Sequence, residues 1–281
     1  MTAHDQSLAA RLRGRDTLLG LVVKMPAASL IEAAGHLGWD LVIIDTEHGA
    51  ADTMQLEGHL RAADSAGIAA VVRVGSHRPE EILRALDAGA SGVVVPHVNT
   101  PEQARAVAAA AHYPPDGHRS LATSTRAGRH STQTLAAHIE RARHETVVIV
   151  QIEDRSAISV ATQIAATPHV DGVWIGLTDL SMSLGLPGDY THPEVAAAVA
   201  AVVDGVTSAG SAALCALADS EQDVAHWHGL GATVVLFVAS QLFARRLREI
   251  AVSKASVAPT APDAEASPQT PGREYEPSGT G

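Results

Sequence analysis

The sequence contains few aromatic residues and almost no cysteine. Phe, Trp and Tyr make up 3% of its 281 residues, so a hydrophobic core must be aliphatic. The single cysteine, Cys215, excludes an intramolecular disulfide and is typical of a reducing cytoplasm. No apolar run reaches the roughly 18 residues of a membrane-spanning helix, and the N-terminus lacks a signal-peptide pattern. We therefore expect a cytoplasmic protein without a membrane segment.

Positive charge is also scarce. The net charge is −11, and the sequence has only two lysines, Lys24 and Lys254. An acidic chain is poorly suited to bind nucleic acid. Hydrophobic residues make up 46% of the sequence, which is enough to form a full core. These features indicate a globular protein and argue against a nucleic-acid partner.

The two ends of the chain differ from its middle. Residues 1–16 contain a short helical pattern at 8–15, which we interpret as a lead-in helix. Residues 253–281 are rich in Pro, Ala, Ser, Thr and Gly and have no apolar periodicity, which predicts a disordered tail. We expect the folded domain at 17–252.

Between these ends, short apolar runs alternate with helical patterns. The runs are continuous and rich in β-branched residues, which is typical of strands buried on both faces. Eight such units in about 235 residues predict a single (β/α)8 barrel. A doubly wound open sheet is the alternative, but no glycine-rich dinucleotide fingerprint follows the first strand. The predicted strands are 18–23, 41–44, 70–74, 92–95, 147–151, 172–175, 212–215 and 233–237, and the predicted helices are 28–37, 53–66, 79–88, 101–112, 156–166, 193–209, 220–228 and 241–251.

Two of these strands are followed by a carboxylate. Glu153 follows the strand at 147–151, and Asp179 follows the strand at 172–175. Parallel strands joined by one helix have their C-terminal ends side by side, so both carboxylates should lie on the rim where barrels bind ligands. Two carboxylates and water suit a hard divalent cation that keeps positions open for a substrate. The alternative is that both are surface loop acids.

Other polar residues follow strands at the same rim. His48 follows the second strand, Arg73 ends the third, and Gln151 ends the fifth. The structural alternatives are that His48 is a loop histidine, that Arg73 is an ion-pair partner of Glu47 or Asp45, and that Gln151 is a buried amide. Polar groups on buried strand ends need a reason to be there. Their convergence therefore favours a catalytic site.

Asp87 and one long connection are further candidates. Asp87 lies near the end of the third predicted helix, where pairing with Arg84 is the structural alternative. The segment 112–146 is longer than an ordinary connection, and long loops at the C-terminal face of a barrel usually serve function. Its Arg126 or Arg129 is a candidate to meet a distal carboxylate of the substrate.

Six short motifs are distributed along the predicted barrel, from about residue 18 to 251. They are Ile43-Ile44-Asp45-Thr46-Glu47-His48, Val71-Val72-Arg73, Leu86-Asp87-Ala88-Gly89, Tyr113-Pro114-Pro115-Asp116-Gly117-His118-Arg119, Gln151-Ile152-Glu153 and Ile175-Gly176-Leu177-Thr178-Asp179-Leu180-Ser181. In this combination and order the chain resembles the HpcH/HpaI family of metal-dependent aldolases. Its type members cleave 4-hydroxy-2-oxo acids to pyruvate and an aldehyde.

The resemblance implies a reaction and a set of roles. It implies a class II aldolase that reversibly cleaves 4-hydroxy-2-oxoheptanedioate or a 2-keto-3-deoxy sugar acid through a metal-stabilised pyruvate enolate. Glu153 and Asp179 would bind Mg2+, Mn2+ or Co2+. His48 would act as base, directly or through water, with Asp87 orienting it, and Arg73 would stabilise the enolate and the aldehyde oxygen. The substrate-binding residues would be Gln151, Thr178, Asp179 and Arg73.

The chemistry explains why these residue types are needed. Breaking the C3–C4 bond leaves charge on the enolate, which a Lewis acid or a lysine Schiff base must take up. Lys24, at the end of the first strand, is the only plausible imine former, because Lys254 falls in the predicted tail. His97 and Cys215 depart from the family pattern, so the aldehyde partner stays open.

Other activities also stay open. An acyl-CoA lyase of the same superfamily would need a basic groove for the CoA phosphates, against which the acidic balance argues. Oxaloacetate decarboxylation, or a biosynthetic carbon–carbon bond formation as in macrophomate synthase, would use the same metal. A non-catalytic ligand-binding barrel is the alternative from another class, but it has no evident use for a pairing of His48 with Asp87.

The resemblance also implies an oligomer. In this family the last helix is exchanged between subunits, and dimers assemble into hexamers. Here the helix 241–251 carries Leu242, Phe243 and Leu247 at helical spacing, although a helix packed on its own barrel would show the same pattern. The expected partners are a 2-oxo acid or pyruvate, an aldehyde and further copies of the chain.

Overall fold

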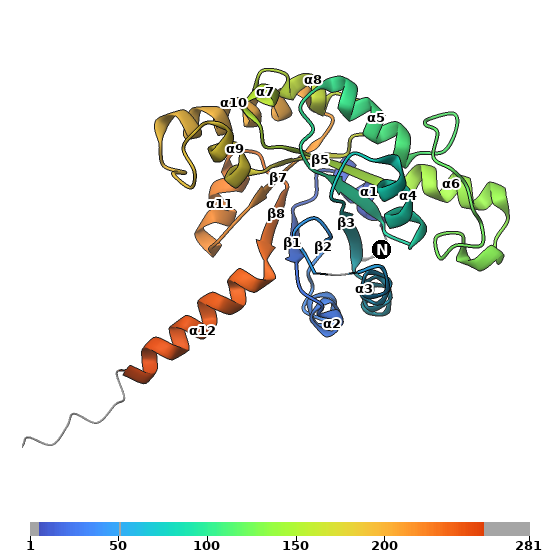
Figure 1. The fold of residues 1–281 in the computed structure, drawn as a ribbon, viewed down its shortest axis with the longest axis horizontal. Helices are drawn as coiled ribbons and strands as arrows, with labels where there is room; N and C mark the ends of the chain where they lie inside the picture. The colour runs from blue at the N-terminus through green and yellow to red at the C-terminus, as the bar shows by residue number, and fades with distance from the viewer. Residues whose placement is uncertain (1–5, 51, 256–281) are drawn as a thin grey trace, which may run out of the picture. The chain divides into compact units, whose positions relative to one another are not determined.

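The computed structural model describes residues 6–50 and 52–255. Its strands pair in sequence order, each parallel to the next, and β8 also pairs with β1, so that the sheet closes into a barrel (Figure 1). The predicted (β/α)8 barrel is therefore confirmed, and the open sheet is wrong. The strands are β1 (Leu18–Val23), β2 (Leu41–Asp45), β3 (Ala69–Arg73), β4 (Gly92–Val95), β5 (Val147–Ile152), β6 (Gly172–Ile175), β7 (Ala213–Leu217) and β8 (Val234–Val238).

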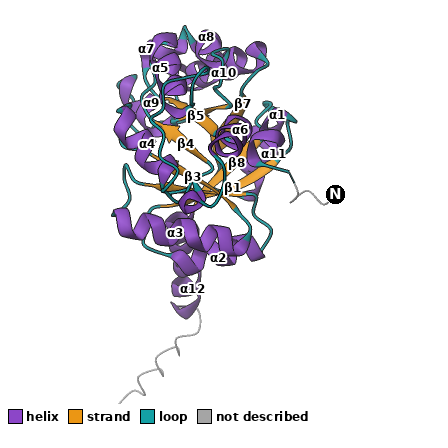
Figure 2. Cartoon of the chain, turned by 90° about the vertical axis from the view of Figure 1, so that its right-hand side faces the viewer, coloured by secondary structure: helices purple, strands orange, loops and turns teal. Residues whose placement is uncertain are grey.

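Helices surround the strands, as Figure 2 shows with helices in purple and strands in orange. The predicted helix 156–166 consists of two short helices, and two further helices occur that the sequence patterns missed, at 135–145 and 177–183. The helices are α1 (Leu8–Arg13), α2 (Ala28–His36), α3 (Thr53–Ala66), α4 (Pro79–Asp87), α5 (Pro101–Ala111), α6 (Leu135–Glu145), α7 (Arg155–Ile158), α8 (Ala161–Ala165), α9 (Leu177–Ser183), α10 (Pro193–Ala209), α11 (Glu221–Gly229) and α12 (Ala239–Ala255), with a short 3-10 helix at Arg129–Ser131.

Local sequence defines where several helices begin and end. Asp52 starts α3 with a capping box, since its side chain accepts from the Gln55 N–H and the Gln55 side chain accepts from the Asp52 N–H. Thr100 forms the same motif at α5. Gly67 ends α3 at a φ of 68°, a left-handed conformation that glycine adopts without a steric penalty.

The core has two layers. One lies between the barrel and its helices, and the other fills the inside of the barrel. Along β2, Leu41 and Ile43 point inward, and the same alternation brings Asp45 to the interior at the C-terminal end of the strand. Ile149 on β5 is followed in the same way by Gln151. Asp45 and Gln151 therefore face the inside of the barrel, at the C-terminal side of its apolar core.

The long connection 112–146 lies at the opposite end of the barrel from the one we predicted. It starts after α5, which runs antiparallel to the strands and so returns the chain to their N-terminal ends. With α6, it borders a cavity of about 780 Å³ that is also lined by Ser91 and Thr146, the residues directly before β4 and β5. Arg126 and Arg129 line this cavity. Within one chain, Arg126 and Arg129 therefore lie far from the cavity at the C-terminal ends of the strands.

The last described helix extends past the predicted domain end. α12 runs to Ala255, three residues into the segment that we assigned to the tail. Residues 256–281 lie outside the described residues, so the predicted disorder there stays a prediction. No helix in the described part of the chain is both long and apolar enough to cross a membrane.

Candidate active site

A buried ion pair joins β2 to β3 at the C-terminal end of the barrel. Asp45 and Arg73 are register partners in the sheet. Arg73 Nε donates to Asp45 Oδ1 at 3.0 Å, and Arg73 Nη2 donates to Oδ2. Asp45 is completely buried and Arg73 nearly so, and the guanidinium lies 5.4 Å from the Trp174 ring centroid. The arginine is thus held in place from two sides.

Asp45 also fixes the loop that follows it. Its Oδ1 accepts the backbone N–H groups of Glu47 and His48, both at 3.1 Å. Gly49 packs so closely on the Asp45 carbonyl that a Cβ would lie 1.9 Å from its oxygen. Burial alone raises the pKa of Asp45, but the hydrogen bonds and charge of Arg73, with the N–H of His48, outweigh it and lower that pKa. The carboxylate therefore stays ionised.

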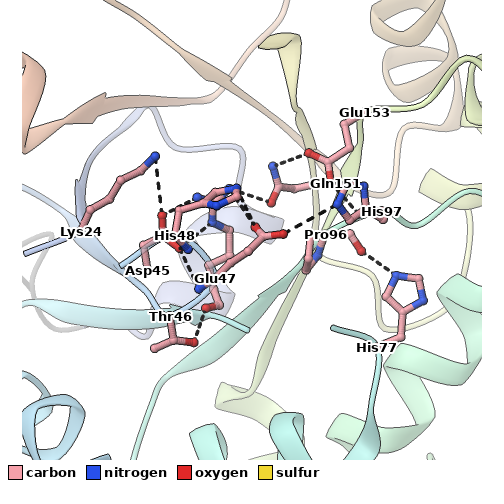
Figure 3. A network of polar contacts seen from close by, with 11 residues as sticks. Lys24, Asp45, Thr46, Glu47, His48, His77, Pro96, His97, Gln151 and Glu153 are labelled. Carbon is pink, nitrogen blue, oxygen red and sulfur yellow. Dashed lines mark hydrogen bonds and ion pairs between the residues drawn. The ribbon is translucent and has the colours of Figure 1, made fainter. Parts of the chain in front are cut away.

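Glu47 and His48 lie at the mouth of the barrel. Glu47 Oε2 is 3.3 Å from Arg73 Nη1 and 3.8 Å from His48 Nε2. The His48 side chain is 56% exposed, so it is open to a ligand. Figure 3 shows both residues in a polar network, with Lys24 on one side of them and Glu153 and His97 on the other.

Gln151 links Arg73 to the first predicted metal ligand. Its Oε1 accepts from Arg73 Nη1 at 3.4 Å, and its Nε2 donates to Glu153 Oε2 at 3.2 Å. Glu153 is 3% exposed and packs against Gly176, where a Cβ would lie 2.4 Å from Oε2. Gln151 is therefore a buried, hydrogen-bonded amide, as the structural alternative held. Its partners, Arg73 and Glu153, are themselves residues of the candidate site.

His97 is a site residue that sequence reasoning noted only as a departure from the family pattern. Its backbone N–H donates to Glu153 Oε1 at 2.7 Å, and its Nδ1 lies 3.1 Å from the same oxygen. Its Nε2 is 3.7 Å from Glu47 Oε1. A φ of 54° turns the backbone toward the carboxylate. His97 lies shortly after the C-terminal end of β4, and this position, which identified the other candidate residues, would also have identified His97.

The environment of Glu153 disfavours an isolated negative charge. Burial raises the pKa of Glu153, and the charges of Asp179 and Glu47 raise it further, whereas the N–H and the ring of His97 oppose the change. A cation beside the carboxylates would relieve this repulsion. Among the residues described, no group of three or more His, Cys, Asp or Glu is arranged to hold a metal. A cation here would rely on two protein carboxylates, with water or substrate completing its shell.

A cavity of about 300 Å³ at the strand ends brings the predicted residues together. Thr178 and Asp179 reach it from the first turn of α9, and the Thr178 hydroxyl lies 3.2 Å from that of Tyr190. Gly176, at the end of β6, also lines it. The predicted residues in its wall are His48, Arg73, Gln151, Glu153, Thr178 and Asp179.

Asp87 does not join this cavity. It ends α4, close to the start of β4, and its Oδ1 accepts from Arg119 Nη2 at 2.7 Å. Its backbone carbonyl accepts from the Ala127 N–H. In the described residues no hydrogen bond or ion pair joins Asp87 to His48. Within one chain, α4 carries Asp87 to the opposite end of the barrel from His48, and its ion-pair partner is Arg119 and not Arg84. The predicted role of Asp87 beside His48 stays a prediction.

The chain is similar to known proteins over most of its length. Residues 18–240 match the family model HpcH/HpaI aldolase/citrate lyase. A protein of Sagittula stellata named hydroxypyruvate/pyruvate aldolase is 40% identical over 190 residues, which cover 68% of this chain and 74% of that protein.

Two solved structures share the fold. An HpcH/HpaI aldolase/citrate lyase family protein from Burkholderia cenocepacia has a TM-score of 0.83 and 32% identity, covering 89% of this chain and 98% of its own. The citrate synthase SbnG has a TM-score of 0.79 and 30% identity, with the same coverage. With the geometry above, these similarities show that the chain belongs to the HpcH/HpaI aldolase/citrate lyase family.

Proposed function

We propose that the protein is a carbon–carbon lyase, a class II aldolase that reversibly cleaves a 4-hydroxy-2-oxo acid to pyruvate and an aldehyde. The substrate class is that of 4-hydroxy-2-oxoheptanedioate or a 2-keto-3-deoxy sugar acid. The observation that carries the proposal is one cavity in which two carboxylates, an amide, a buried arginine and an exposed histidine converge. The relative named hydroxypyruvate/pyruvate aldolase supports pyruvate as the donor half.

The donor set fits a divalent cation, Mg2+, Mn2+ or Co2+. Carboxylate oxygens are the ligands that such hard cations prefer. The polar network and cavity contain four carboxylates but only two residues with a permanent positive charge, Arg73 and Lys24. A divalent cation held by Glu153 and Asp179 would balance this excess. When bound, it would supply a Lewis acid for the 2-oxo carboxylate unit.

The side chains of the chain would carry out the remaining steps. Arg73 and Gln151 would hold the 2-oxo acid, with Thr178 at the edge of the cavity. His48 would remove the proton of the C4 hydroxyl, directly or through water. The C4 oxygen then forms the aldehyde, the C3–C4 electron pair moves toward the pyruvate unit, and Arg73 would stabilise the oxygen on which charge develops. Return of a proton to C3 would complete pyruvate.

We also propose that the working protein is a homo-oligomer, a hexamer built as a trimer of dimers. α12 carries the large apolar residues Phe243, Leu247 and Ile250 at helical spacing, an apolar stripe that a second copy of the chain would cover. Asp87 could meet His48 only if another copy supplied it. Size-exclusion chromatography with light scattering tests this, since a monomer would contradict it.

The aldolase proposal is tested by measuring pyruvate release. Candidate substrates are 4-hydroxy-2-oxoheptanedioate and 2-keto-3-deoxy sugar acids, each with Mg2+, Mn2+ or Co2+ and again with EDTA. We expect cleavage that requires metal and is lost in Glu153→Ala. Cleavage that survives EDTA would contradict the metal mechanism, and an absence of cleavage of every such acid would contradict the aldolase.

A second candidate is carbon–carbon bond formation in the synthetic direction. The similarity to the citrate synthase SbnG favours it, because that protein has the same barrel at 30% identity. Incubation with oxaloacetate and acetyl-CoA, followed by assay for citrate, distinguishes the two candidates. Citrate formation at a rate above that of aldol cleavage would favour the synthase.

A further inference from the structure

Lys24 is a cation in the cavity wall that the proposed reaction does not use. It follows β1, its side chain lines the cavity, and it is 35% exposed. Its backbone is fixed, because the Lys24 carbonyl accepts from the Ala50 N–H at 3.3 Å. Its Nζ lies 3.8 Å from Asp45 Oδ2, beyond hydrogen-bond distance. In the described part of the chain Nζ donates no hydrogen bond to a protein acceptor, so its donors are available to a ligand.

Lys24 is the weakest of the groups that compensate the charge of Asp45. The carboxylate already receives two hydrogen bonds from Arg73 and two from the backbone of Glu47 and His48. A structural ion pair would bring the ammonium into contact with an oxygen that still needs a donor. The long separation therefore argues that Lys24 serves something in the cavity rather than Asp45.

The position of Lys24 in the barrel indicates which part of the substrate it faces. In a closed barrel of eight strands, β1 lies opposite β5, which carries Gln151 and is followed by Glu153. Figure 3 shows Lys24 and Glu153 on opposite sides of Glu47 and His48. If the pyruvate unit is held on the β5 and β6 side, the aldehyde half extends toward β1. Of the lining residues on β1 and the strands on its β8 side, Val22, Leu217 and Val238 are apolar, and on the other side His48 follows β2.

We propose that Lys24 determines acceptor specificity by binding an anionic group, such as a carboxylate, at the far end of a short aldehyde. This inference rests on the proposed aldolase function. The cavity has room for about ten water-sized groups, which is enough for pyruvate and an acceptor of a few carbons. Lys24 Nζ makes no hydrogen bond in the described residues, so an anionic acceptor would supply a direct contact, whereas a neutral acceptor would leave only the 3.8 Å ion pair with Asp45. The ammonium should therefore favour a charged end over an alkyl end.

The test compares acceptors in the synthetic direction, with pyruvate and metal present. Glyoxylate and succinic semialdehyde carry the carboxylate, whereas acetaldehyde and butanal lack it. We expect Lys24→Met to raise the KM for the anionic aldehydes at least about tenfold, equivalent to 1.4 kcal/mol, with little change in kcat. The KM for the neutral aldehydes should stay the same or fall. Lys24→Arg should retain most of the preference.

Arg78→Met is the matched control, because it removes an exposed cation that does not line the cavity. An equal change in KM for both aldehyde classes in Lys24→Met, or the same change in Arg78→Met, would overturn the proposal. Loss of all activity in Lys24→Met, together with borohydride trapping of pyruvate on the wild-type protein, would overturn it in favour of an imine.

A separate measurement shows whether the underlying function is at fault. Wild-type protein with metal should exchange the methyl protons of pyruvate for deuterium in D2O without any acceptor. If this exchange fails, the aldolase proposal fails with it. If exchange occurs but Lys24→Met does not discriminate between acceptors, only the role of Lys24 is refuted.

Discussion

Replacing Asp45 by Asn tests whether the buried pair with Arg73 organises the site. Asn keeps the shape and one acceptor oxygen, but its amide group cannot accept from Arg73 Nη2, which now contacts Asp45 Oδ2. Both residues are buried, so the change leaves a guanidinium without its full partner. Breaking such a pair costs about 3–5 kcal/mol, and we expect about 3 because the Oδ1 interactions survive. The melting temperature should fall by roughly 6–12 °C.

The assay is a double-mutant cycle measured by urea denaturation. Asp45→Asn, Arg73→Gln and the double variant should give a coupling energy of about 2 kcal/mol or more. Arg61→Gln, which removes an exposed helix-surface pair with Glu57, serves as a control and should change the midpoint little. Additive effects in the cycle, or a loss below about 1 kcal/mol in Asp45→Asn, would refute the view that this pair holds the mouth of the barrel together.

Three further predictions concern the carboxylate, the base and the pH dependence. Gly176→Ala should weaken Mn2+ binding at least about tenfold in calorimetric titration, because its Cβ would displace the Glu153 carboxylate, whereas Gly58→Ala, which meets nothing within 4 Å, should not. His48→Gln should lower kcat for cleavage by roughly 10²–10⁴ while Mn2+ affinity stays within about twofold, and unchanged kcat would exclude it as the base. Burial lowers the pKa of His59, whose Nε2 accepts from the Ala27 N–H. The neutral His59 therefore contributes its full stability above the ordinary histidine pKa of 6.5, and this contribution is lost as the pH falls toward the lowered pKa. Urea midpoints of the wild-type protein should fall between pH 7 and 5, and those of His59→Gln should fall less.

The barrel could be predicted from the sequence because its determinants are local. Each strand is a short β-branched run, and helix starts such as Asp52 and Thr100 carry their own capping residues. That polar residues after the strands gather at one end of the barrel could be predicted for the same reason. α6 was missed because it buries only His138 and so shows no apolar stripe.

Three-dimensional placement explains what the sequence left out. The length of segment 112–146 suggested a functional loop, whereas the direction of α5, which returns the chain to the strand starts, decides where the segment lies. Asp87 was placed by motif, whereas the direction of α4 decides where it lies. His97 acts through a backbone N–H and a left-handed φ, and neither property can be read from a side-chain pattern.

The exchange of pyruvate methyl protons in D2O tests the central claim most directly, because it isolates the metal-dependent half of the reaction from the unknown aldehyde. Proton NMR would follow the methyl signal with Mg2+, Mn2+ or Co2+, with EDTA, and in Glu153→Ala, with Gly58→Ala as the control. We predict enzyme-dependent exchange that EDTA abolishes and Glu153→Ala lacks. Exchange that persists in EDTA and in Glu153→Ala would contradict the account.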